Sequence, residues 1–165
     1  MRLLSQRTET CLTVALLSVA LTAAAQEPGT ADGQWPSYGG DLTHQRYSPL
    51  DQITADNFDE LEVAWTFKTD NLGPQPERNY QSTPLMVNGV LYVTAGSRRS
   101  VVAMAPETGE LLWSFTEPNT HRYEYSMRKG YGKGVAYAEV PGRGGVVFIS
   151  TPGFFLWALD ADTGQ

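Results

Sequence analysis

The sequence predicts an all-β fold assembled from repeated four-stranded units, and three observations support it. The 165 residues include 16 glycines and 10 prolines, which is typical of a chain with many turns rather than long helices. From Pro84 onward, short runs of β-branched and aromatic residues alternate with turn signals. Residues 156–165 (LWALDADTGQ) then repeat residues 101–110 (VVAMAPETGE) position for position, at an offset of about 55 residues.

The N-terminal residues have the pattern of an export signal. Arg2 and Arg7 lie before an apolar run at residues 11–21 (CLTVALLSVAL), and alanines at 23–25 form a small-residue cleavage site. We therefore expect a signal peptide over residues 1–25, a mature chain that starts at Gln26, and a periplasmic location. The apolar run is about half of the roughly 20 residues that a membrane-spanning helix needs. An uncleaved anchor or a core helix stays open as an alternative.

Charge and cysteine content exclude several functions for the mature chain. A net charge of −6 and a pI near 4.8 argue against a nucleic-acid partner, because phosphate binding needs a basic face. Cys11 is the single cysteine and lies in the predicted signal peptide, so no disulfide, thiolate or haem-attachment site is expected after cleavage. Residues 26–34 are polar and turn-rich, which predicts a flexible leader before an ordered part that begins at Trp35.

The first ordered elements are predicted to be a short helix and a strand. Residues 51–60 favour the helix, with Thr54 or Asp56 as its cap. Residues 61–67 (LEVAWTF) alternate in polarity and are rich in β-formers, which predicts the strand. Residues 68–79 contain proline, glycine and asparagine and are predicted to be a loop.

Residues 85–115 predict a four-stranded antiparallel meander. Asn88-Gly89 is expected to join its first two strands, because a tight hairpin needs positive φ at both positions. Such a meander is the unit, or blade, of a β-propeller. Residues 146–165 hold part of a second blade and residues 61–67 part of another, so the chain contains about two to three blades of a partial propeller. The four strands are expected at residues 85–87, 90–94, 101–105 and 111–115.

The turn after the third strand carries a family resemblance. Residues 103–113 (AMAPETGELLW) resemble the tryptophan-docking motif of pyrroloquinoline quinone (PQQ) dehydrogenases, Ala-x-Asp-x-x-Thr-Gly-x-x-x-Trp, with Ala105 in place of the aspartate. Residues 158–164 (ALDADTG) fit the motif as far as its glycine. The glycine takes the positive φ of the turn, and Trp113 offers a flat surface to the next blade.

Segments ahead of the first blade extend the resemblance. Residues 35–41 (WPSYGGD), 46–50 (RYSPL) and 63–65 (VAW) look like the start of the alcohol and glucose dehydrogenase branch. The resemblance covers residues 35–165 and implies that the chain is the N-terminal part of a propeller of about eight blades. It also implies an enzyme that oxidises alcohols or sugars with PQQ and calcium, and that passes electrons to a cytochrome or a quinone.

The resemblance further implies three cofactor-binding residues. Gln81 falls where many members have a glutamate against the cofactor, and its amide can form hydrogen bonds without the charge. Lys133 falls where the family has an arginine near the quinone oxygens, and an ammonium stabilises a developing oxyanion. Met127-Arg128 replace the adjacent cysteines that form a ring over PQQ, and Arg128 can pair with a cofactor carboxylate. Exposed loop positions without cofactor contact are the alternative for all three.

The remaining chemistry-bearing residues point to structural roles. His44 and His121 are isolated, so a metal pair is not expected. The run Asp160-Ala161-Asp162 is expected to stabilise a turn, because the matching residues of the first repeat lack its spacing of carboxylates. No catalytic residue or metal ligand is assigned within the chain, because the family's catalytic carboxylate and calcium ligands belong to later blades.

Two functions stay open at this point. One is a periplasmic PQQ- and calcium-dependent dehydrogenase, of which this chain is an N-terminal fragment without activity of its own. The other is a non-enzymatic propeller with the same repeats, such as an outer-membrane assembly scaffold or a sensor. Gln81 and Lys133 favour the enzyme, because a scaffold needs only the Thr-Gly-Trp repeats.

Overall fold

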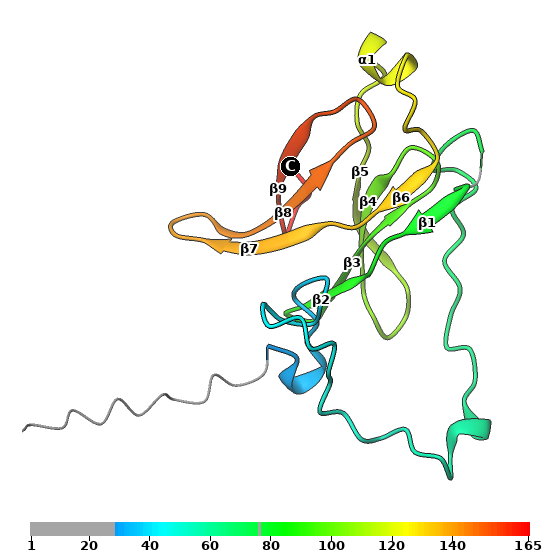
Figure 1. Ribbon diagram of the computed structural model, residues 1–165, viewed down its shortest axis with the longest axis vertical. Helices are drawn as coiled ribbons and strands as arrows, with labels where there is room; N and C mark the ends of the chain where they lie inside the picture. Colours follow the sequence, from blue (N-terminus) through cyan, green and yellow to red (C-terminus); the bar gives the residue numbers. More distant parts are fainter. Residues whose placement is uncertain (1–28, 76) are drawn as a thin grey trace, which may run out of the picture.

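The structure, a computed structural model, describes residues 29–75 and 77–165. The predicted signal peptide and the first part of the predicted leader lie outside these residues. The described chain consists mainly of strands and turns (Figure 1). Its elements are η1 (Ala31–Gly33), η2 (Phe58–Glu60), β1 (Asn79–Gln81), β2 (Leu85–Val87), β3 (Val90–Ala95), β4 (Ser100–Met104), β5 (Leu111–Phe115), α1 (His121–Glu124), β6 (Tyr131–Lys133), β7 (Ala136–Val140), β8 (Gly144–Ser150) and β9 (Leu156–Asp160), where η denotes a 3-10 helix.

The predicted meander is confirmed. Strands β2, β3, β4 and β5 form one antiparallel sheet in chain order, named unit 1 here. Asn88 and Gly89 have φ values of 51° and 79°, as the hairpin between β2 and β3 requires. Val101 and Val102, neighbours on β4, are both fully buried. Because successive residues of a strand point to opposite faces, unit 1 is covered on both sides of β4.

A second sheet, named unit 2 here, repeats the first three strands of unit 1. It consists of β7, β8 and β9 in that order. The sequence suggested that residues 146–150 match residues 91–95, but in the structure Val147 rather than Val146 takes the place of Leu91. Val147 pairs with Leu159 where Leu91 pairs with Met104, so the connection before β9 is one residue shorter than in unit 1.

The turns that follow β4 and β9 have the same backbone geometry. The Gly109 N–H donates to the Ala105 carbonyl, and the Gly164 N–H donates to the Asp160 carbonyl, both at 2.8 Å. The glycines have φ values of 69° and 73°, a region that residues with side chains rarely adopt. The repeat seen in the sequence is therefore a repeat of structure.

Each unit contacts a tryptophan that comes from an earlier part of the chain. The Trp113 Nε1 of β5 donates to the Ala161 carbonyl of unit 2 at 2.8 Å. In the same way, the Trp65 Nε1 donates to the Pro106 carbonyl of unit 1 at 2.8 Å. The docking that the resemblance implies for Trp113 is present, and it also occurs one unit earlier, where sequence analysis did not recognise it.

Glycine is required beneath both indoles. A β-carbon at Gly109 would lie 2.5 Å from the Trp65 ring, and one at Gly164 would lie 2.5 Å from the Trp113 ring. Distances this short are not tolerated between carbon atoms, so a side chain at either glycine would displace the tryptophan. The Thr-Gly step of the motif therefore serves both the turn and the joint between units.

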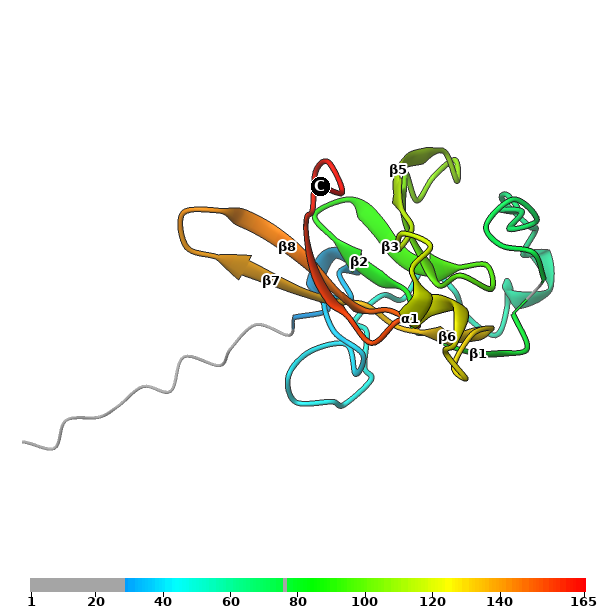
Figure 2. The same cartoon turned by 90° about the horizontal axis from the view of Figure 1, so that it is seen from above.

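The main hydrophobic core lies between the two units. It combines Leu85 and Trp113 of unit 1 with Ile149 of unit 2, all of them buried. A smaller cluster on the other face of unit 1 contains Val102 and packs against Trp65. Unit 1 is thus enclosed between unit 2 and the segment around Trp65, and the two sheets can be followed from above in Figure 2.

Residues 61–67 are not a strand, contrary to the prediction. No backbone hydrogen bond from residues 62–67 to a described residue is present. The predicted alternation is nevertheless real, because Trp65 and Phe67 are half-buried against unit 1 while their neighbours are exposed. A strand also needs a partner to bond with, and the described residues supply none.

The predicted helix at residues 51–60 is reduced to the 3-10 turn η2. Asn57 occupies its N-cap position, where Thr54 or Asp56 was expected, and makes no capping bond with its side chain. Its Oδ1 instead accepts a hydrogen bond from the Thr54 N–H at 2.7 Å, which favours a turn over a longer helix. In residues 29–75 and 77–165, no helix has the length and apolar character needed to cross a membrane.

Contacts with unit 1 begin before Trp35. Thr30 is 2% exposed, and the Gln34 Oε1 accepts a hydrogen bond from the Asn88 N–H at 2.9 Å. The backbone of Trp35 then pairs with Met86 along the outer edge of β2. The last residues of the predicted leader therefore pack against the β2–β3 hairpin.

Candidate functional site

Two short strands that sequence analysis missed position the candidate site. β1 leads into β2, and β6 leads into β7, so each stands at the start of a unit. The two pair in parallel, with Asn79 opposite Tyr131 and Gln81 opposite Lys133. Figure 1 shows them side by side. This pairing brings together two of the predicted site residues, which are 52 positions apart in the sequence.

Gln81 and Lys133 are in direct contact. The Lys133 Nζ donates a hydrogen bond to the Gln81 Oε1 at 2.7 Å. Both residues are exposed, so Lys133 retains two further N–H donors and Gln81 retains its amide NH₂. The pair is therefore a cluster of donors whose amide oxygen is already bonded.

The surrounding residues fix the position of β6. Thr94 is 1% exposed, and its Oγ1 donates to the Lys133 carbonyl at 2.7 Å. A β-carbon at Gly132 would lie 2.6 Å from the Tyr80 ring, so glycine at this position allows β6 to approach β1. Burial raises the pKa of the Tyr80 phenol, so this group is a neutral hydroxyl at physiological pH.

Arg128, the third predicted site residue, does not join this pair. It is exposed, and its guanidinium carbon lies 5.8 Å from the centroid of the Tyr131 ring. Its backbone N–H donates to the Ser126 Oγ at 3.1 Å. None of its contacts within the described residues reaches Gln81 or Lys133. Arg128 thus stands on the loop that leads into β6.

Arg99, which no motif singles out, holds this loop against both units. It is 7% exposed and donates to the carbonyls of Tyr131 at 2.9 Å, Ser150 at 2.7 Å and Arg128 at 3.3 Å. Burial lowers the pKa of its guanidinium, and the charge of Glu117 opposes that change. Arginine stays protonated at any physiological pH. Its charge is therefore distributed over three carbonyls at the base of β6.

The donors around the pair fit the cofactor that the resemblance implies. The Ser82 Oγ, next to Gln81 in sequence, is a buried hydroxyl beside the Tyr80 phenol. An ammonium, an amide and a hydroxyl suit the carboxylates and carbonyls of PQQ. Lys133 and Gln81 are the residues that would hold it.

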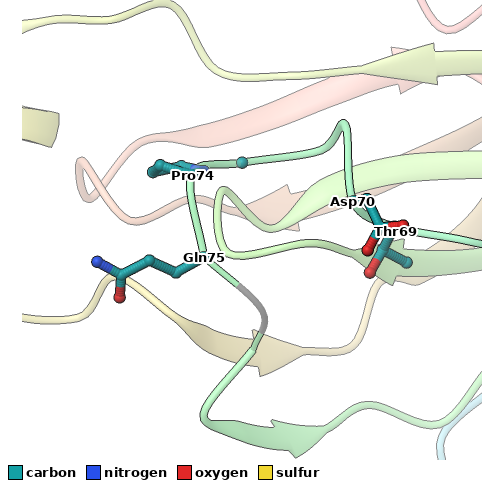
Figure 3. A pocket seen from close by; sticks show the side chains of 5 residues that line it. Thr69, Asp70, Pro74 and Gln75 are labelled. Carbon is teal, nitrogen blue, oxygen red and sulfur yellow. The ribbon is translucent and has the colours of Figure 1, made fainter.

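Cavity volume does not locate the candidate site. Two cavities, of about 260 Å³ and about 400 Å³, lie near the start of β1, and another of about 430 Å³ lies between residues 29–43 and β7. None of these three is lined by Gln81 or Lys133. In the cavity of about 260 Å³, Figure 3 shows Thr69 and Asp70 on the opposite side of the loop from Gln75. The contacts of Gln81 and Lys133 therefore define the candidate site.

The other predicted roles can be placed as well. Asp160 stabilises a turn, as expected, because its Oδ1 accepts from the Asp162 N–H at 3.1 Å and from the Thr163 N–H and hydroxyl at 2.9 and 2.8 Å. His44 precedes η2, whereas His121 begins α1. Within residues 29–75 and 77–165, no group of three or more His, Cys, Asp or Glu side chains could hold a metal ion.

Known proteins share both the sequence and the fold. The dehydrogenase subunit of alcohol dehydrogenase (quinone) from Gluconobacter oxydans (strain 621H) is 35% identical over 159 residues, 90% of this chain and 19% of that protein. The 1-butanol dehydrogenase (cytochrome c) from Thauera butanivorans is 35% identical over 153 residues, 92% of this chain and 20% of that protein. The solved quinohemoprotein alcohol dehydrogenase from Comamonas testosteroni has a TM-score of 0.64 at 31% identity, covering 83% of this chain and 19% of its own.

These comparisons also define how much of a larger protein the chain represents. It spans about a fifth of the length of the curated relatives that it matches. Residues 35–165 match the family described as PQQ, glucose/ethanol/alcohol dehydrogenase, beta-propeller domain. The repeated units, their docked tryptophans and this match together show that the chain belongs to the family of PQQ-dependent glucose, ethanol and alcohol dehydrogenase β-propellers.

Proposed function

We propose that this chain is the N-terminal part of a quinoprotein dehydrogenase that oxidises alcohols or sugars with PQQ and calcium. The observation that carries the proposal is the contact between Lys133 and Gln81, which places an ammonium and an amide at the start of both units. The relatives support it, because their names describe alcohol dehydrogenases that use a quinone or cytochrome c. A propeller that serves only as a scaffold has no need of this exposed donor pair.

Each residue of the site has a defined task in this proposal. When bound, PQQ supplies a quinone that accepts two electrons from the substrate. The Lys133 ammonium stabilises negative charge on an adjacent carbonyl oxygen. Gln81 orients Lys133 through its Oε1 and offers its amide N–H to an acidic group. Arg128 has an exposed guanidinium that is available to a cofactor carboxylate.

The proposal extends to parts of the protein beyond this site. The calcium ligands and the carboxylate base belong to the remaining blades, and the electron acceptor is a cytochrome or a quinone. The pattern at residues 1–25 supports export to the periplasm with removal of the signal peptide. These parts are supported by the sequence pattern and by the family rather than by contacts of the described residues.

Dye reduction by a full-length protein that carries this segment tests the function. Reconstituted with PQQ and calcium, it should reduce an artificial acceptor in the presence of an alcohol or a sugar. Lys133→Ala should lower turnover about 10²-fold or more, because charge stabilisation at the quinone is lost. Lys129→Ala is the matched control and should leave turnover unchanged, because Lys129 donates to the carbonyl of Glu124 at the end of α1.

The 165-residue chain should remain inactive in the same assay. The cofactor of this family is enclosed by several blades, whereas this chain provides two sheets of the repeat. Turnover by the short chain would contradict its assignment as a fragment. Absence of PQQ-dependent turnover by the full-length protein across a panel of alcohols and sugars would reject the dehydrogenase and favour the non-enzymatic propeller.

A further inference from the structure

Strand β6 is held on its two edges in different ways. One edge pairs in parallel with β1. On the other edge, side chains of unit 1 donate to its carbonyls: the Thr94 Oγ1 to Lys133 at 2.7 Å, and the Arg99 Nε to Tyr131 at 2.9 Å. Carbonyls two residues apart in a strand point to the same side. Thr94 and Arg99 therefore take the place that a second neighbouring strand would have.

Both donors belong to one end of the β3–β4 hairpin. Thr94 lies near the end of β3, and Arg99 closes the turn that follows, where its N–H donates to the Gly96 carbonyl at 3.0 Å. Thr94 is 1% exposed and Arg99 is 7% exposed. Because the two side chains are buried against a four-stranded sheet, they hold β6 at a fixed place on unit 1.

The backbone of Arg99 is in a conformation that the turn alone does not explain. Its φ is 56°, in the left-handed region that residues with a β-carbon rarely adopt. Glycine takes this conformation without strain, so the turn does not require an arginine. Strained residues of this kind persist where their surroundings determine them, often at functional sites. Here the surroundings are the carbonyls of Tyr131, Ser150 and Arg128, which the side chain bridges.

A buried carboxylate supports Arg99 from unit 1. Glu117, which follows β5, is 2% exposed, and its charge acts on the Arg99 guanidinium. Its Oε2 accepts a hydrogen bond from the Gly153 N–H at 3.0 Å, while Arg99 donates to the Ser150 carbonyl at 2.7 Å. The two residues of unit 1 therefore hold the loop between β8 and β9 at two points. Arg99 alone connects this loop to β6 as well.

We propose that Arg99 is a positioning residue of the cofactor site, which acts through Lys133. This inference rests on the proposed function, because it requires that Lys133 contacts PQQ. Arg99 is buried and all three of its guanidinium nitrogens donate to carbonyls, so it acts on the cofactor through β6. Gln81 orients the Lys133 ammonium from β1, whereas Arg99 and Thr94 fix the backbone of β6 from unit 1.

Titration of PQQ into a full-length protein that carries this segment, followed by protein fluorescence with calcium present, measures the effect of Arg99. Arg99→Lys keeps the positive charge but replaces the planar fork by a single nitrogen, which cannot bridge the same carbonyls. The variant should raise the dissociation constant of PQQ about 10- to 100-fold, as is usual when the support behind a binding residue is removed. A long-range effect of charge alone predicts an unchanged constant.

A double-mutant cycle separates positioning from a general structural role. In a protein that already carries Lys133→Ala, Arg99→Lys should change the dissociation constant of PQQ by less than about 2-fold, because the effect of Arg99 passes through the Lys133 side chain. A structural role predicts the same fold-change with and without Lys133. Equal fold-changes in the two backgrounds therefore overturn the proposal.

Arg98→Lys is the matched control. The Arg98 Nη2 donates to the Glu117 carbonyl at 2.6 Å, and its guanidinium carbon lies 4.4 Å from the centroid of the Tyr123 ring. None of its hydrogen bonds within the described residues reaches β6. The same substitution one residue earlier should therefore leave the affinity for PQQ unchanged, with or without Lys133.

Thr94→Val is the second test variant, and it decides the proposal if Arg99→Lys does not fold. It removes the hydroxyl that donates to the Lys133 carbonyl while keeping a β-branched side chain. It should weaken the binding of PQQ in the same direction as Arg99→Lys, and the effect should again disappear in the Lys133→Ala background. Urea unfolding identifies which variants are folded. Unchanged affinity for PQQ in the folded variants overturns the proposal.

Hydrogen exchange followed by mass spectrometry gives a measurement that needs no cofactor. Without PQQ, the amides of residues 131–133 should exchange about 10-fold faster in Arg99→Lys, while β2 and β3 keep their protection. Arg98→Lys should exchange as the protein without substitutions does. Unchanged exchange of residues 131–133 overturns the positioning role. If the protein without substitutions does not bind PQQ, the proposed function is rejected, and the exchange rates still decide whether Arg99 positions β6.

Discussion

At the scale of single residues, one of the differences between the turns after β4 and β9 bears on their stability. Asp160 accepts three hydrogen bonds within its turn, whereas Ala105, at the same place in unit 1, has no group that could accept them. Both turns nevertheless close with the same backbone bond to their glycine. The backbone and the glycine therefore define the turn, and the carboxylate of Asp160 adds to its stability.

This difference predicts a pH-dependent effect of Asp160→Ala. The Thr163 hydroxyl and backbone N–H hold the pKa of the Asp160 carboxyl below its usual value of 3.8, so the ionised form is the stabilising one. The variant should therefore have a lower urea midpoint than the unchanged chain at pH 7. The difference should be fully present above about pH 4 and should disappear as the pH falls through the lowered pKa. Equal midpoints at pH 7 would contradict this role.

The candidate site shows what the sequence could predict at this scale. Motif positions identified Gln81 and Lys133 separately, but their contact depends on a parallel pair of three-residue strands. Strands this short carry no periodic pattern, so the pairing could not be predicted. The role of Arg99 is equally hidden, because its partners are backbone carbonyls, which every residue possesses.

At the scale of elements, a single indole joins each unit to the next. Trp113 is 9% exposed, and it combines apolar contact in the core with a hydrogen bond to the Ala161 carbonyl. Tyr92 stands beside it, with its ring centroid 5.9 Å from that of Trp113, and donates to the same carbonyl at 3.2 Å. The joint therefore concentrates packing and hydrogen bonding on one tryptophan.

Trp113→Ala should lower the free energy of unfolding by about 3–5 kcal/mol, the usual range for a large buried aromatic residue. Trp113→Phe should cost less, because it keeps an aromatic ring and loses mainly the N–H bond, which contributes about 1 kcal/mol. Chemical denaturation of the full-length protein measures both. An unchanged midpoint for Trp113→Ala would show that the joint does not depend on docking.

Elements defined by local signals were predicted well, and those that depend on distant partners were not. The meander of unit 1 follows from its hairpin residues and from short β-rich runs, which act over a few positions. Residues 61–67 have the side-chain alternation of a strand but lack a neighbour in the described chain. The correspondence between β8 and β3 differs by one residue from the expected one. Hydrophobic character alone does not determine which residues of neighbouring strands lie opposite each other.

At the scale of the whole molecule, the described contacts begin close to the predicted cleavage site. Thr30 is already buried, and Gln34 bonds to the first hairpin. Removal of residues 1–25 takes away none of these contacts. The predicted processing is therefore compatible with a mature chain that keeps its full set of described interactions.

In a Gram-negative host the exported protein should begin at or near Gln26, because the alanines at 23–25 match the small-residue requirement of the cleavage site. Mass spectrometry or N-terminal sequencing of periplasmic material measures the start. Detection of an intact segment from Met1 to Ala25 on that material would reject the prediction. A variant with Ala25→Arg should accumulate in the unprocessed form.

The docking contact tolerates different lengths of chain between its two residues. Its hydrogen bond spans 41 residues from Trp65 to Pro106 but 48 residues from Trp113 to Ala161, with the same geometry. The additional residues lie mainly in the connection from β5 to β7 and in the hairpin between β7 and β8. That connection also carries Lys133. Insertions and deletions can therefore reshape the loops around the candidate site during evolution while the joint between units stays constant.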